Sequence, residues 1–207
     1  MTSIESNWRG VVFGLALASF AAYQQFKLPP ALPLLLETYA YDRTLAGSFM
    51  SVFAAAGLVL SLGLGRYMER RGTVNLVLLA LGLMALGNLG TLAAPEAGLM
   101  VLLARTIEGC AFAVFAIAGP VLANRHASPR HLPLVVALTA AWIPIGQLTA
   151  TLLAQPAFVL FGWQSLWWFG LGLTVVFGLW LLVLRRDQTV RLGAEAGAHP
   201  AGNGNAG

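Results

Sequence analysis

The feature that most constrains this sequence is a series of six long apolar runs separated by short polar turns. A helix needs about 20 apolar residues to cross the ~30 Å hydrocarbon core of a bilayer. Hydrophobic residues make up 58% of the chain and charged residues only 10%, which does not fit a soluble domain. We predict an all-α, polytopic membrane protein, a bundle of six transmembrane helices within residues 1–187. The runs cover residues 11–36, 45–64, 74–94, 98–122, 132–154 and 165–184.

Prolines and small residues predict how these helices bend and pack. Pro29, Pro30 and Pro33 follow Lys27 in the first run and predict a kinked or locally unwound outer half, because proline cannot donate a backbone hydrogen bond. Small residues four apart let a neighbouring helix approach closely. Two such stripes occur, Gly57, Ser61 and Gly65 in the second run and Gly146, Ala150 and Ala154 in the fifth.

Basic residues between the runs predict the orientation in the membrane. Of the twelve lysines and arginines, nine fall on one side of the membrane and only Arg43 on the other, while Lys27 and Arg105 lie within the spans. By the positive-inside rule both termini are cytoplasmic, and we expect a multi-pass protein of the plasma (inner) membrane. Residues 188–207, rich in glycine, alanine and asparagine, are expected to form a disordered cytoplasmic tail. The nine basic residues on the cytoplasmic side are Arg9, Arg66, Arg70, Arg71, Arg125, Arg130, Arg185, Arg186 and Arg191.

Several function classes are disfavoured by the sequence. The net charge of +4 comes mainly from arginines in turns, without the basic patch and interleaved aromatics of a nucleic-acid-binding protein. His126 and His131 share a turn, but their spacing fixes no metal geometry and no third ligand is visible. We see no catalytic constellation at membrane depth and no phosphate-binding loop of an ATP-driven pump. We therefore expect neither an enzyme nor a cofactor.

Three ionisable residues, Lys27, Arg105 and Glu108, lie well inside the spans. Lys27 is ten residues before Glu37 and Arg105 ten residues after Pro95, so each lies about 15 Å below the outer surface at 1.5 Å per residue. That depth is close to the midplane. Charges there cost several kcal/mol to bury and usually face the interior of a bundle.

Helical spacing predicts that these residues share one site. Phe20, Tyr23, Gln24 and Lys27 occupy one face of the first helix, and Arg105, Glu108 and Phe112 one face of the fourth. Two cations and one acid suit a small anionic solute, with Glu108 as a candidate proton carrier. An alternative stays open, in which Glu108 neutralises Arg105 or bridges to Lys27 and only locks two helices together. We expect one aqueous, substrate-binding cavity lined by Tyr23, Gln24, Lys27, Arg105 and Glu108.

The charged turn between the second and third runs, residues 65–72, carries a recognisable pattern, Gly-x-x-x-Glu-Arg-x-Gly. It resembles the signature at the same place in major facilitator superfamily transporters, with Gly65, Glu69, Arg70 and Gly72 on the matching positions. Glu69 replaces the usual aspartate, and Thr73 and Val74 stand where the family prefers basic residues. Arg105-x-x-Glu108-Gly109 likewise resembles the family's R-x-x-Q-G signature, with glutamate in place of glutamine.

This resemblance implies a secondary transporter, a symporter or an antiporter, in which Gly65, Glu69, Arg70 and Gly72 form a conformational latch. Family members resemble two six-helix halves, each made of two inverted three-helix repeats. The chain corresponds to the N-terminal half, with residues 188–207 at the place of a truncated linker. We therefore expect a second six-helix half or a second copy as partner, because the buried charges of half a cavity would face lipid. A non-transporting six-helix subunit and a truncated, non-functional product are the alternatives.

Overall fold

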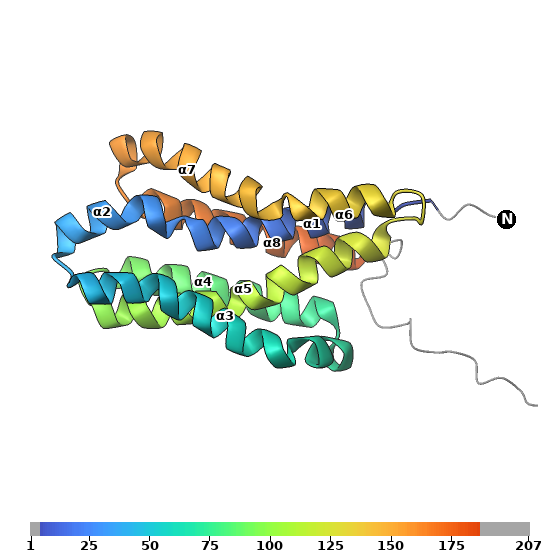
Figure 1. The fold of residues 1–207 in the computed structure, drawn as a ribbon, viewed down its shortest axis with the longest axis horizontal. Helices are drawn as coiled ribbons and strands as arrows, with labels where there is room; N and C mark the ends of the chain where they lie inside the picture. The colour runs from blue at the N-terminus through green and yellow to red at the C-terminus, as the bar shows by residue number, and fades with distance from the viewer. Residues whose placement is uncertain (1–4, 187–207) are drawn as a thin grey trace, which may run out of the picture.

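The computed structural model describes residues 5–186, apart from the side chains of Glu69 and Arg71. Within that range the chain is helical, without strands (Figure 1). The predicted tail, residues 188–207, lies outside the described residues. The helices are α1 (Trp8–Phe26), α2 (Leu28–Tyr39), α3 (Arg43–Arg71), α4 (Thr73–Ala93), α5 (Gly98–His126), α6 (Leu132–Ala140), α7 (Trp142–Phe161) and α8 (Gln164–Arg186).

Six segments of the described chain are long and apolar enough to cross a membrane, which confirms the predicted six-span bundle. The first span combines α1 and α2, which meet at Lys27. The break occurs there because Pro30 has no N–H to donate to the carbonyl of Phe26. The outer half is not unwound, since α2 continues as a helix with Pro33 inside it.

The fifth span differs from the prediction of 132–154. Residues 132–140 form the separate helix α6, and the apolar span itself is α7, which ends at Phe161. The break lies at Ala141, three residues before Pro144. Pro144 has no N–H to donate to the carbonyl of Ala140, which ends the first helix at that point. Apolar composition alone gave no sign of the break.

Helix α5 lies at the centre of the bundle and packs against α1, α3 and α4, while α7 packs on α1 and α8 on α4. The predicted small stripe of α7 is confirmed, because Gly146, Ala150 and Ala154 are all buried. A Cβ on Gly146 would lie 2.5 Å from the carbonyl oxygen of Ser19, so only glycine allows this approach. In the stripe of α3, Gly57 packs against α5, whereas no atom of the described residues lies within 4 Å of a Cβ built on Gly65.

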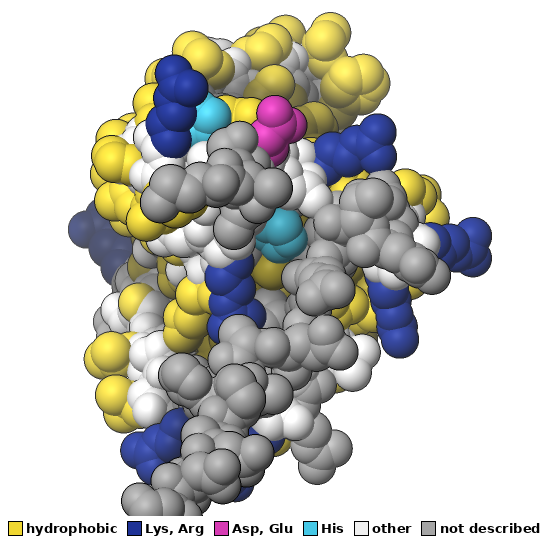
Figure 2. All heavy atoms as spheres, turned by 90° about the vertical axis from the view of Figure 1, so that its right-hand side faces the viewer, with side chains coloured by type: hydrophobic (Ala, Val, Ile, Leu, Met, Phe, Trp, Pro, Cys, Tyr) yellow, Lys and Arg dark blue, Asp and Glu magenta, His cyan; other side chains and the backbone are white. Residues whose placement is uncertain are grey.

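Arginines gather at one end of the bundle, where α1 begins and α8 ends. Figure 2 looks onto this end and shows basic side chains distributed around it. Arg43 begins α3 at the opposite end. The distribution on which the positive-inside prediction depends is therefore present in the fold. The described arginines of this basic end are exposed: Arg9, Arg66, Arg70, Arg125, Arg130, Arg185 and Arg186.

Candidate functional site

The candidate site lies between two clusters of buried apolar side chains. One cluster extends along α1, α4 and α5 as far as Ala21, Met84 and Ala111. The other begins at Leu28 on α2 and at Val101 on α5. The site therefore occupies the middle of the bundle, as the depth estimate predicted. Five polar side chains with no solvent exposure form it: Gln24, Lys27, Asn88, Arg105 and Glu108.

Lys27 is the hub of this network. It lies at the break between α1 and α2, and its buried ammonium is 5.0 Å from the ring centre of Trp167. An ammonium has three N–H donors, and here each has an acceptor. Lys27 Nζ donates to Gln24 Oε1 at 2.7 Å, to Asn88 Oδ1 at 2.7 Å and to Glu108 Oε1 at 2.9 Å.

Arg105 approaches the other oxygen of the same carboxylate. Its Nη1 donates to Glu108 Oε2 and to the main-chain oxygen of Gln24, the latter at 3.3 Å. The guanidinium lies over the ring of Phe53, 4.3 Å from its centre. Arg105 Nε and Nη2 are buried and have no hydrogen-bond partner among the described residues. The site thus holds two cations, one carboxylate and two arginine nitrogens whose N–H groups have no acceptor in the described chain.

The remaining hydrogen bonds fix the network to its walls. Gln24 Nε2 donates to the carbonyl of Gly170 on α8 at 3.1 Å, and Asn88 Nδ2 to that of Met84 at 2.7 Å. A Cβ on Gly170 would lie 3.0 Å from both amide oxygens, so α8 closes this side of the site by virtue of a glycine. Tyr23 donates its hydroxyl to the carbonyl of Leu166 at 2.7 Å. Helices α1, α4, α5 and α8 therefore enclose the charges.

The structure brings together four of the five predicted binding residues, Gln24, Lys27, Arg105 and Glu108. The hydroxyl of the fifth, Tyr23, is engaged by α8. The expectation that half a bundle leaves these charges facing lipid is wrong, because all three charged side chains are sealed inside the monomer. The described conformation is closed around the network, whereas an aqueous cavity was expected.

Asn88 and Trp167 were not recognised as parts of the site. Asn88 carries no charge, so the cost of burying charge does not single it out, although an amide in the middle of an apolar run is a usable signal. Trp167 is easily overlooked because, with Trp168, it stands near the start of the sixth apolar run and suggests an interfacial aromatic belt. Only Trp168 is exposed, whereas Trp167 is fully buried beside Lys27. Adjacent residues of a helix point in different directions, which explains the error.

Comparison with known families matches residues 12–202 to the model of the Major Facilitator Superfamily. The chain belongs to this family. Its members are membrane transporters and not enzymes. No match was found among curated proteins. The matched region contains both signatures found in the sequence, residues 65–72 at the end of α3 and the Arg105 motif of α5.

The major facilitator signature, residues 65–72, does not form the predicted turn, because α3 continues as a helix through Arg71 and ends only at Gly72. Gly72 separates the two helices with φ of +82°, a backbone conformation that favours glycine. Arg70 is exposed, and Gly65 faces open space in the described chain. The side chain of Glu69 lies outside the described part. The latch formed by Gly65, Glu69, Arg70 and Gly72 stays a prediction.

Histidines of the basic end have protein partners. His126 Nδ1 lies 2.7 Å from the carbonyl oxygen of Leu122, and His131 Nδ1 lies 2.9 Å from Ser6 Oγ. Among the described residues no group of histidine, cysteine and acidic side chains is placed to hold a metal ion.

Proposed function

We propose that the chain acts in secondary active transport of a small organic anion together with protons, and that Lys27, Arg105 and Glu108 form its binding site. The observation that supports this most is the shared carboxylate. Two buried cations, Lys27 and Arg105, contact Glu108, and two nitrogens of Arg105, Nε and Nη2, have no acceptor among the described residues.

The charge balance favours an anionic substrate. A buried charge without a partner costs several kcal/mol, so a site with one excess positive charge gains from an incoming anion. Arginine presents its donors in a planar fork that matches a carboxylate in two parallel hydrogen bonds. The unused Nε and Nη2 of Arg105 offer such a pair. A small carboxylate is therefore the substrate class that we propose.

Glu108 supplies a route to proton coupling. Its carboxylate competes with a substrate anion for both Lys27 and Arg105, because it contacts each of them. A proton on Glu108 removes that competing charge. By linkage, protonation then strengthens anion binding and anion binding strengthens protonation by the same factor. The proton and the anion would thus travel in the same direction, as in a symporter.

Movement of the helices is needed before a substrate can reach the site. All three charged side chains have zero exposure, so the described state is occluded. The Lys27–Glu108 ion pair joins the α1–α2 break to α5 and would have to separate for opening. A structural lock that moves no substrate is the second candidate, and the complete enclosure of the network favours it.

The proposal also includes a partner for this chain and an orientation of its helices in the membrane. Helices α3 and α7 bury the smallest shares of their apolar windows, 22% and 17%. We propose that a second six-helix half, or a second copy, covers their exposed sides and completes the path. The exposed arginines of the basic end support placing both termini in the cytoplasm and the protein in the plasma (inner) membrane.

Uptake into proteoliposomes separates the two candidate functions. The purified chain would be tested with radiolabelled acetate, lactate and succinate, with and without an inward proton gradient, alone and with any co-expressed second half. Transport predicts gradient-driven uptake that Arg105→Ala abolishes. The exposed Arg66→Ala is the matched control and should retain uptake. Folded protein with no uptake of any anion would favour the structural lock.

A further inference from the structure

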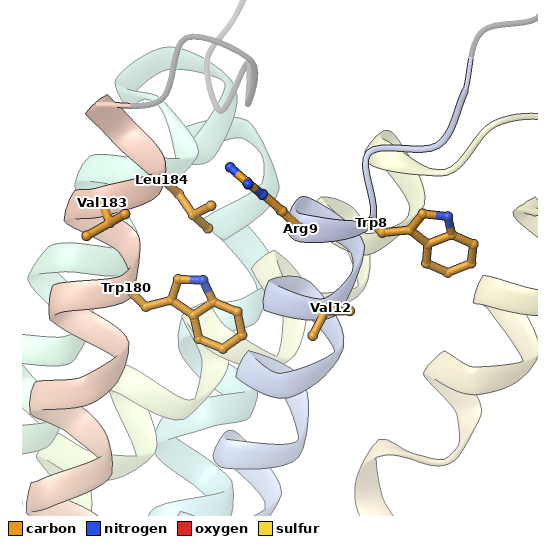
Figure 3. A pocket seen from close by; sticks show the side chains of 6 residues that line it. All are labelled: Trp8, Arg9, Val12, Trp180, Val183 and Leu184. Atoms are coloured by element: carbon orange, nitrogen blue, oxygen red, sulfur yellow. The ribbon is translucent and has the colours of Figure 1, made fainter.

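A groove at the basic end has no part in the proposed transport site. It lies between the first turns of α1 and the last turns of α8 and has a volume of about 480 Å³, within the range of small-molecule sites. In Figure 3, Arg9 extends from α1 toward α8 and Trp180 extends from α8 toward α1. Its lining residues are Trp8, Arg9, Val12, Trp180, Val183 and Leu184.

The groove has an apolar floor and a cationic rim. Trp180 is held in place by Phe13, whose ring centre lies 5.2 Å away. Val12 and Val183 are about half exposed or more, at 49% and 64%, so the groove opens sideways toward the lipid. Arg9 is the charged residue of the lining, and the exposed Arg185 and Arg186 follow directly after the groove along α8.

The level of the groove in the membrane suits a lipid headgroup. Trp180 lies six residues before the end of α8, about 9 Å along the axis at 1.5 Å per residue. Tryptophan and arginine at that depth are typical of the boundary between hydrocarbon and headgroups. The headgroup end is positively charged, and the wall below it is apolar. This arrangement is complementary to an anionic phospholipid, whose negative headgroup lies above apolar acyl chains.

We infer that the groove binds one anionic phospholipid of the leaflet at the basic end. The phosphate would accept hydrogen bonds from the guanidinium of Arg9, with Arg185 and Arg186 adding positive potential. An acyl chain would lie against Val12, Trp180 and Val183. Such a lipid would hold the start of α1 against the end of α8. Neutral phospholipids would bind the same wall more weakly.

Native mass spectrometry of the full chain in detergent micelles tests this inference. The protein would be titrated with phosphatidylglycerol and, separately, with phosphatidylcholine carrying the same acyl chains. Phosphatidylglycerol should bind more tightly, and Arg9→Gln should weaken it about fivefold, the effect expected for one arginine near the surface. Arg9→Lys should keep most of the preference. Arg66→Gln, at the same end but outside the groove, should change binding less than about twofold.

Three results would overturn the inference. Equal losses in Arg9→Gln and Arg66→Gln would indicate diffuse attraction to the whole basic end. Equal binding of the two lipids would mean that the headgroup is not selected. Displacement by the same concentration of inorganic phosphate would identify a simple anion site instead. Melting temperatures in phosphatidylcholine would show whether Arg9→Gln folds. If it does not, Val183→Phe replaces it, and unchanged phosphatidylglycerol binding in that variant would contradict the inference.

Discussion

Lys27 Nζ and Glu108 Oε1 lie 2.9 Å apart, although 81 positions separate the two residues and neither side chain is exposed. The pair connects the interruption of the first span to the central helix α5. Arg105 approaches the other oxygen of Glu108 from one turn earlier on the same helix. One carboxylate therefore contacts two cations from different spans and leaves one positive charge in excess, so we expect both the stability and the opening of the bundle to depend on it.

The first prediction concerns the coupling of this pair. Glu108→Gln leaves both cations without a counter-charge and should destabilise the fold by about 3–5 kcal/mol. Lys27→Met should cost less, because Arg105 still pairs with Glu108. The double variant should be more stable than the sum of the two losses implies, by about 1–3 kcal/mol. Unfolding in mild detergent measures all three. Strictly additive losses would show that the two side chains do not interact.

The second prediction concerns the approach of α3 to α5. A Cβ on Gly109 would contact the carbonyl oxygen of Phe53 and lie 3.0 Å from its Cα. Gly109→Ala should therefore lower the stability by about 1–3 kcal/mol, as overpacking does. Gly63→Ala is the matched control, because no atom of the described chain lies within 4 Å of its Cβ position. It should change the stability by less than about 1 kcal/mol. Equal effects in the same unfolding assay would contradict this packing.

The third prediction is a pH dependence at the opposite end of the bundle. Tyr41, in the link between α2 and α3, donates its hydroxyl to the carbonyl of Pro95. Burial, with Tyr39 and Glu96 nearby, raises the pKa of Tyr41 from 10.0 to about 12. The folded state holds this proton more tightly, so the resulting stability is complete below pH 10.0 and is lost toward about 12.

Thermal unfolding between pH 9 and about 12 measures this loss. The wild type should lose stability more steeply over that interval than Tyr41→Phe, which has no hydroxyl to titrate. Identical slopes in the two proteins would show that Tyr41 does not carry the effect.

The fourth prediction is the orientation of the spans. Single cysteines would be placed at Asp42, Glu96, Arg70 and Arg130 in a Cys110→Ser background. An impermeant thiol reagent applied to intact cells should label positions 42 and 96 directly. Positions 70 and 130 should react only after the cells are permeabilised. The reverse pattern would reject the assignment of the basic end to the cytoplasm.

Much of the fold was predictable, because lipid requires long apolar helices and their ends carry the charges. The meeting of Lys27 with Arg105 and Glu108 followed from equal depth and from the cost of exposing charge to lipid. The closure of the site did not follow. It depends on Asn88, which is uncharged, and on Gly170, whose missing side chain lets α8 approach the amides. Such contacts between distant segments leave no periodic trace in the sequence.

The latch signature shows another limit of sequence patterns. Gly65 was expected to bring two helices together, yet its surroundings in the described chain are open. A residue in a sequence pattern can act in another conformation of the protein or in contact with a partner. The structure of one chain in one conformation shows only the contacts made there. Gly72 is different, because its positive φ is a local feature that favours glycine without any neighbouring helix.

The central claim is that Glu108 couples protons to an anion held by Lys27 and Arg105. Its most direct test is the internal pH of proteoliposomes, followed with a trapped dye after an inward lactate gradient is imposed. The wild type should acidify the interior as lactate enters. Glu108→Gln should take up lactate without acidification. Arg105→Lys, which lacks the guanidinium fork, should show much slower lactate uptake and much slower acidification. Undiminished acidification by Glu108→Gln, or wild-type uptake of lactate by Arg105→Lys, would contradict the account.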